Sequence, residues 1–166
     1  MAEDVKPIGA DPTGYEYMKK AVKDLLNQFP GLEGQNICFE ELGESAGIAF
    51  SADVGALVMS ERRSITDHIT QSCQFPFLVV YRTTATREFQ KLKVSSFLDT
   101  LGKWLCKEPV DIGGTKHRLL SYPMIADGRM ITRINRDNCY GLTPNENKSQ
   151  DWVLPISVQY TYEFDL

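Results

Sequence analysis

A short run of small residues contains the side chain best placed by its motif to act as a nucleophile. Residues 43–47 read GESAG and match G-x-S-x-G, the pattern in which serine hydrolases present their reactive serine. That chemistry needs a strand that delivers the serine, here Ser45, to a sharp turn followed by a helix. Residues 37–41 predict such a strand, but residues 48–60 contain Gly55 and no helical periodicity. We therefore interpret the segment as a turn, and a small serine hydrolase using Ser45 stays as an alternative.

The remaining groups of a catalytic triad are poorly placed along the chain. Asp111 and His117 occur in the required order after the serine, but close together, and no HGGG-type oxyanion segment is present. His68 or His117 could act as a general base only with a nucleophile and an orienting group in reach. The acetyltransferase pattern His-x-x-x-Asp also fails, because Ser72 and Ser121 occupy the fourth position after these histidines. We predict surface histidines and no catalytic residue.

Phosphate, metal and cofactor sites are not predicted either. Residues 113–116 read GGTK but lack the first glycine of a phosphate loop and the Ser or Thr that would follow the lysine, which indicates a turn. Structural zinc sites need closely spaced ligand pairs, and no two cysteines here form a CxxC pair. We expect four reduced thiols that act as small core residues: Cys38, Cys73, Cys106 and Cys139.

Length and composition favour one domain. A chain of 166 residues, 42% hydrophobic and 24% charged, can bury about two thirds of its unfolded surface. The net charge of −4 argues against a surface that coats nucleic acid, and we expect no sequence-specific nucleic-acid binding. No signal peptide or membrane-spanning stretch is visible. We expect a mobile leader over residues 1–11 and a single domain over residues 12–166.

Two amphipathic helices are predicted. Asp11 and Pro12 provide an N-cap and a proline at the first helical position, and apolar residues at helical spacing continue to Phe29, before Pro30 and Gly31. A second helix is predicted over residues 85–105. Its apolar stripe consists of Phe89, Val94, Phe97, Leu98, Leu101, Trp104 and Leu105.

The strands are predicted mainly from apolar runs and turn residues. Residues 48–50 and 56–59 read as short strands, and residues 75–83 as a central strand covered on both faces. Asp127 and Gly128 predict a hairpin turn between residues 124–126 and 129–131. Residues 135–151 are polar and predict a long loop.

The last fifteen residues show the clearest periodicity. Every even position from Trp152 to Leu166 is apolar, which predicts a strand with one face on the core. Pro155 cannot donate to a ladder, so we expect the regular strand to begin near Ile156 and, at about 33 Å, to fit within the body. The predicted fold is α+β, a two-layer sandwich of two amphipathic helices on a mostly antiparallel sheet.

Three segments resemble a known family. The runs FLVVYR (77–82), FLDTLGKWL (97–105) and WVLPISVQY (152–160), in this order, are similar to minor capsid and tail-terminator (head–tail junction) proteins of long-tailed phages and prophages. The resemblance extends over residues 12–166. It implies a helix-and-sheet subunit that assembles into a ring, usually a hexamer, beside tail-tube and head-connector proteins.

The expected function follows from this resemblance and from the missing catalytic pattern. We expect a non-enzymatic virion structural protein, a minor capsid or tail-terminator subunit in a homo-oligomeric ring. Its expected location is the virion, and the host bacterial cytoplasm before assembly. The alternatives are the small serine hydrolase described above and an unassigned cytosolic binding module, which an apolar pocket would favour.

Overall fold

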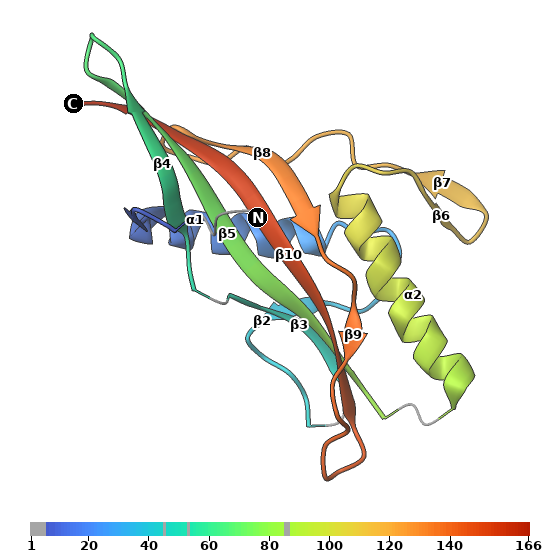
Figure 1. Ribbon diagram of the computed structural model, residues 1–166. Helices are drawn as coiled ribbons and strands as arrows, with labels where there is room; N and C mark the ends of the chain where they lie inside the picture. The colour runs from blue at the N-terminus through green and yellow to red at the C-terminus, as the bar shows by residue number, and fades with distance from the viewer. Residues whose placement is uncertain (1–5, 45, 53, 85–86) are drawn as a thin grey trace, which may run out of the picture.

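Two long antiparallel strands form the axis of the sheet. In the computed structural model, which describes residues 6–44, 46–52, 54–84 and 87–166, β5 (His68–Thr83) and β10 (Gln150–Asp165) are each 16 residues long. They pair antiparallel along their whole length, from Gln150 opposite Thr83 to Asp165 opposite His68. Figure 1 shows them crossing the molecule side by side.

Shorter strands share the two outer edges of this central pair. Strands β4 (Leu57–Arg63) and β3 (Gly47–Ala52) both pair antiparallel with β5. Beyond them, β1 (Gly9–Ala10) pairs antiparallel with β4, and β2 (Ile37–Phe39) forms a parallel pair with β3. On β10 lie β8 (Arg129–Arg136) and β9 (Tyr140–Gly141). A separate hairpin joins β6 (Val110–Ile112) to β7 (Thr115–His117).

Both predicted helices are present. Helix α1 (Pro12–Leu26) begins as expected, with the Asp11 side chain accepting a hydrogen bond from the Gly14 N–H (3.0 Å). Helix α2 (Glu88–Leu105) buries most of its predicted stripe, but Phe89 was wrongly included, since it is 67% exposed. Phe89 lies in the first turn, beyond the reach of the core. With these helices on a mostly antiparallel sheet, the predicted α+β fold is confirmed.

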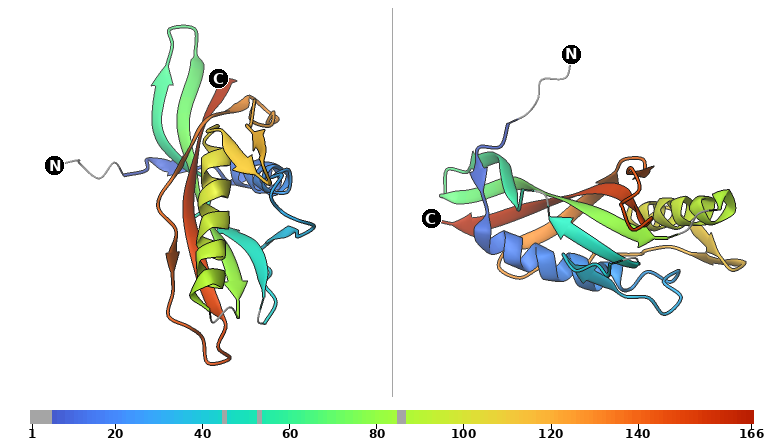
Figure 2. Two further views of the ribbon diagram at one scale, coloured as in Figure 1. Left: turned by 90° about the vertical axis from the view of Figure 1, so that its right-hand side faces the viewer. Right: turned by 90° about the horizontal axis from the view of Figure 1, so that it is seen from below.

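The core lies between the helices and one face of the sheet. Phe75, Phe77 and Val79 of β5 point into it, and Phe29 after α1 packs on Trp104 of α2 with ring centroids 5.5 Å apart. Figure 2 shows α1 across this face and α2 along its margin. The prediction that residues 75–83 are covered on both faces was wrong, because alternate residues such as Leu78 face a side without helices and are only half-buried.

The predicted start of the terminal strand near Ile156 was also wrong. Strand β10 begins at Gln150 and runs through Pro155. The Pro155 carbonyl accepts a hydrogen bond from the Asp137 N–H (3.0 Å), in the gap between β8 and β9. Because the N and O of a strand residue point to the same side, the proline nitrogen faces this gap, where no ladder partner is needed.

A three-stranded arm therefore projects beyond the body. It comprises residues 60–63 of β4, 68–72 of β5 and 162–165 of β10, and it extends past the end of α1 in both views (Figures 1 and 2). At about 3.3 Å per residue, β10 spans roughly 50 Å, longer than the body of a compact chain of this size. The expectation that the terminal strand fits within the body was wrong for this reason.

Three smaller differences concern the connections. The hairpin predicted around Asp127 and Gly128 is reduced to one bridge between Met124 and Met130, although both turn residues have positive φ, as a type I′ turn requires. The predicted loop 135–151 contains β9 and the ends of β8 and β10. At the N-terminus, residues 9–10 pair with β4, where we expected a mobile leader.

Candidate functional site

The GESAG segment lies in the connection between β2 and β3. Ser45 lies outside the described residues, but its neighbours define the local path: β2 precedes the segment, and β3 begins at Gly47. The elbow motif requires a helix after the serine, and here a strand of the main sheet follows. The strand continues because Ile48 and Phe50 pack into the core, while Ala49 lies on the opposite face.

The two histidines lie far from this segment in the fold. His117 is in β7 opposite Val110, and the Asp111 carboxylate accepts a hydrogen bond from the Gly114 N–H (3.0 Å) in the same hairpin. Gly113 and Gly114 form its turn with φ of +60° and +83°, as predicted for residues 113–116. Asp111 therefore orients the turn, and no hydrogen bond or ion pair joins it to His117 in the part of the chain that the structure describes.

His68 has an acidic partner on each side of its ring. Its Nδ1 lies 2.8 Å from Oδ1 of Asp165, and its Nε2 lies 3.9 Å from Oε2 of Glu163. The nearby Ser64 hydroxyl instead accepts hydrogen bonds from the backbone N–H of Thr66 and of His68. The imidazole thus ties the start of β5 to the end of β10, and no described hydroxyl is presented to it as a nucleophile.

The four thiols are free and separated. Cys73 is buried, and the other three are half-buried. Burial, with a further contribution from the Asp11 charge, raises the pKa of the Cys73 thiol to about 11. Within the described ranges, no group of three or more His, Cys, Asp or Glu side chains could hold a metal ion.

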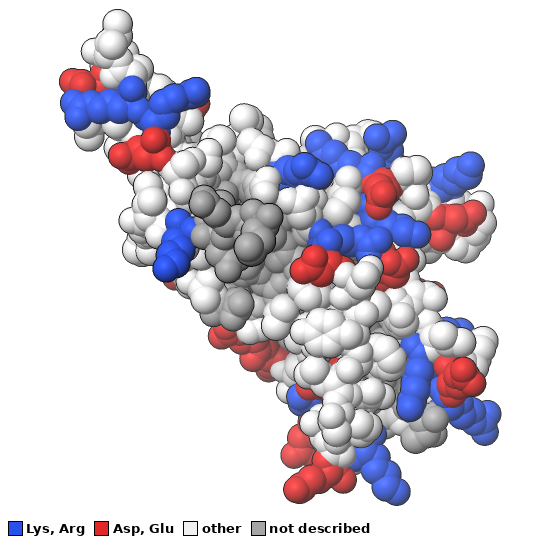
Figure 3. Space-filling view, in the orientation of Figure 1, with Lys and Arg blue, Asp and Glu red and all other residues white. Residues whose placement is uncertain are grey.

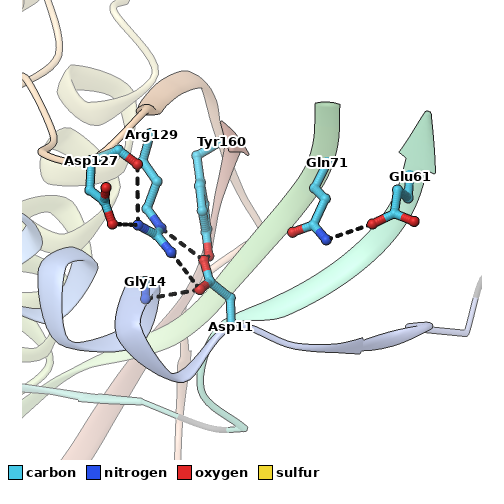
Figure 4. A network of polar contacts seen from close by, with 7 residues as sticks. All are labelled: Asp11, Gly14, Glu61, Gln71, Asp127, Arg129 and Tyr160. Carbon is cyan, nitrogen blue, oxygen red and sulfur yellow. Dashed lines mark hydrogen bonds and ion pairs between the residues drawn. The ribbon is translucent and has the colours of Figure 1, made fainter. Parts of the chain in front are cut away.

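The structure contains a buried ionic cluster that the sequence did not predict. We call it the clamp and define it as Asp11, Arg129 and Tyr160 (Figure 4). Arg129 donates from Nη2 and Nε to the two Asp11 oxygens, at 2.8 and 3.0 Å, and the Tyr160 hydroxyl donates to Oδ2 at 2.8 Å. Asp11 and Arg129 are only 7% and 4% exposed. The clamp joins the first turn of α1 to β8 and β10.

The surroundings of the clamp keep both charges in place. Although burial raises it, hydrogen bonds from Arg129, Tyr160 and Gly14 hold the pKa of the Asp11 carboxyl below its ordinary value of 3.8. Burial and the hydrogen bond to Asp11 raise the pKa of Tyr160. The Arg129 guanidinium also lies 3.8 Å from the ring centroid of Tyr162, a cation–π contact.

Gly14 makes the close approach in the clamp possible. A Cβ atom at this position would lie 1.9 Å from Oδ2 of Asp11 and 2.8 Å from the Tyr160 hydroxyl. Both carboxylate oxygens of Asp11 already accept hydrogen bonds, from Gly14, Arg129 and Tyr160. The clamp therefore fixes the start of α1 beside the base of the arm.

A second feature is the sheet face that no helix covers. Over the middle of β5 and β10 the outward positions of this open face carry no charged side chain. On these two strands charged residues return only at Arg82 and Asp151, which pair at 2.7 Å, and at Glu163. The outward residues between these ends are Thr70, Ser72, Gln74, Pro76, Leu78 and Val80 on β5, and Val153, Pro155, Ser157, Gln159 and Thr161 on β10. On the neighbouring strands, Arg133 of β8 lies opposite Gln159 and Arg62 of β4 lies opposite Thr70, so charges border this face.

Comparison with known proteins does not assign the chain to a class beyond its α+β fold. No protein-family model matches the sequence, and a search of curated proteins found no match. None of the described helices is long and apolar enough to cross a membrane.

Proposed function

We propose that this chain is a non-enzymatic structural protein of a phage or prophage virion, a minor capsid or tail-terminator subunit. In this proposal it assembles into a homo-oligomeric ring, a hexamer by family resemblance, at the head–tail junction. Its partners there are tail-tube and head-connector proteins, and its location is the virion after a cytoplasmic stage in the host bacterium.

The observation that carries the proposal is the uncharged open face of the sheet. In a chain that is 24% charged, the six outward positions on β5 and the five on β10 carry no charge. Apart from Val153, which is already buried (3% exposed), they are suited to burial against another protein, because the buried core of protein interfaces is depleted in charged residues. The arm adds a second element that extends beyond the subunit and can reach a neighbour. The resemblance over residues 12–166 supplies the kind of assembly.

Light scattering of the purified chain, with negative-stain images, tests the assembly. We expect a ring that forms with rising concentration or on mixing with a tail-tube or head-connector partner. A chain that stays monomeric at high concentration and with both partners would refute the proposal.

A matched pair of variants tests the open face. Ser72→Lys places a charge on this face, opposite Ser60 and Thr161, and Ser96→Lys places the same charge on α2; both serines are exposed. We expect only Ser72→Lys to weaken assembly, with unfolding midpoints unchanged in both. The hydrolase alternative has its own test, since modification of Ser45 by a fluorophosphonate probe would favour it, and we expect none.

A further inference from the structure

An open groove lies beside the C-terminal end of α2. It has a volume of about 500 Å³, and its lining includes three cations, Lys107, Arg133 and Arg136, against one acid, Glu108. Figure 3 shows Lys and Arg side chains gathered over β8 and this end of α2. We call it the basic groove.

The cations of the basic groove differ in how far they are already neutralised. Arg136 pairs with Asp99 of α2 at 2.7 Å, and the Lys107 ammonium lies 4.3 Å from the ring centroid of Tyr122. Arg133 is exposed and forms no ion pair with any described residue. The groove therefore presents at least one cation whose charge the subunit itself does not balance.

The connection between β2 and β3, residues 40–46, carries the opposite charge. Glu40, Glu41 and Glu44 are exposed, and none of them takes part in an ion pair within the described part of the chain. The backbone here is held from both sides, since Arg82 Nη1 donates to the Gly43 carbonyl (3.1 Å) and Asn147 donates to that of Glu44 (2.9 Å). We call residues 40–44 the acidic connection.

These two surfaces lie at opposite edges of the sheet. The acidic connection joins β2 to β3, outside β5, whereas the basic groove borders β8, outside β10. One copy cannot bring them together, but a neighbouring copy in head-to-tail orientation can. Contacts of this heterologous kind close into rings when the rotation between subunits allows it.

We propose that the basic groove receives the acidic connection of the next copy, and that this contact joins neighbouring subunits around the ring. The inference rests on the ring assembly proposed above and names the surfaces that make it. The occupant follows from charge: an exposed group of carboxylates without partners and a groove with an unbalanced guanidinium are complementary, and such pairs set the orientation and specificity of association.

Charge reversal tests this contact in the full chain. Arg133→Glu and Glu41→Arg should each raise the concentration at which rings form by about tenfold or more, because each places like charges in the contact. In a heterologous contact the reversed groove of one variant faces the reversed connection of the other. We therefore expect the double variant, and an equimolar mixture of the two single variants, to recover rings to within about threefold of the unchanged chain.

Two control substitutions separate this contact from a general effect of charge. Lys20→Glu and Asp24→Arg reverse a charge in the same two directions, at exposed positions of α1 that form no ion pair with described residues, and they should leave assembly unchanged. If Arg133→Glu and Glu41→Arg assemble as well as these controls, or if mixing does not restore rings, the proposed contact is refuted but the proposed ring assembly is not. An unchanged chain that never forms rings would overturn both.

Discussion

Replacing Asp11 with alanine tests whether the clamp holds the fold together. The substitution removes the N-cap of α1 and deprives the Arg129 guanidinium, 4% exposed, of its buried carboxylate partner, so that only the exposed Asp127 carboxylate, 3.2 Å from Nη1, still pairs with it. Breaking a buried ion pair by removing one partner costs about 3–5 kcal/mol, and loss of an N-cap about 1 kcal/mol. We expect the free energy of unfolding in urea, followed by circular dichroism, to fall by about 4 kcal/mol or more, a large part of the roughly 5–15 kcal/mol typical of a domain.

A double-mutant cycle shows whether this loss comes from the pair. Removing both charges in Asp11→Ala with Arg129→Met leaves no buried unpaired ion, since Asp127, which loses its partner, is exposed. The double variant should therefore be about 2 kcal/mol more stable than Asp11→Ala alone. Asp24→Ala, an exposed position on the same helix, should change stability by less than about 0.5 kcal/mol. A loss below about 1 kcal/mol for Asp11→Ala, as for a surface ion pair, would refute the reasoning.

The pH dependence of stability provides an independent signature. Because the pKa of Asp11 is lower in the folded chain than its ordinary value of 3.8, the unfolded chain takes up the proton first as pH falls. The stability that Asp11 contributes is therefore complete above its unfolded pKa and is lost as pH falls through its folded pKa. We expect the unchanged chain to lose stability more steeply below about pH 4.5 than Asp11→Ala does. Equal slopes would contradict the assigned charge.

Three further predictions concern packing and reactivity. Gly14→Ala should destabilise the chain by about 1 kcal/mol or more despite the higher helix propensity of alanine, since its Cβ would displace the Asp11 carboxylate; a stabilised variant in urea would contradict the geometry. Leu154→Ala should cost about 2–5 kcal/mol of unfolding free energy because this side chain is 0% exposed, whereas Leu142→Ala, 45% exposed, should cost less than 1 kcal/mol; comparable losses would show that the core is misplaced. Cys73, buried and with its pKa raised to about 11, should be the last of the four thiols to react with iodoacetamide at pH 8, as followed by mass spectrometry of peptides.

Local patterns were enough to predict the elements that bury a face. Asp11 and Pro12 mark the start of α1 because capping is decided within one turn of helix. The alternation in β10 identified its core face correctly, with Leu154 and Val158 both at 0% exposure. Both patterns involve residues that are close together in the sequence, so they could be recognised without knowledge of the fold.

The clamp could not be predicted in this way. Asp11 and Arg129 are 118 residues apart, and nothing around Arg129 distinguishes it from a surface arginine in a hairpin. Arginine is also among the residues least often fully buried, so the residue type of Arg129 predicts an exposed side chain. The only local sign was Gly14, a residue with low helix propensity inside an otherwise regular first turn, which makes sense once the carboxylate beside it is known.

Pro155 is the reason why the start of the terminal strand was predicted too late, and its position in the sheet bears on assembly. A proline in a sheet is tolerated where its nitrogen faces no ladder partner, and here it faces the gap between β8 and β9. The strand therefore continues, and β5 and β10 pair without a register shift from the body into the arm, whereas β4 has a bulge between Val58 and Ser60 at the base of the arm. Because the clamp fixes Tyr160 two residues before the arm begins at Tyr162, the body end of β10 is held by side chains as well as by the ladder. An arm continuous with the sheet and fixed at its base can meet a neighbouring subunit with little loss of conformational freedom, and a rigid contact of this kind retains more of its binding free energy than one made by a flexible tail.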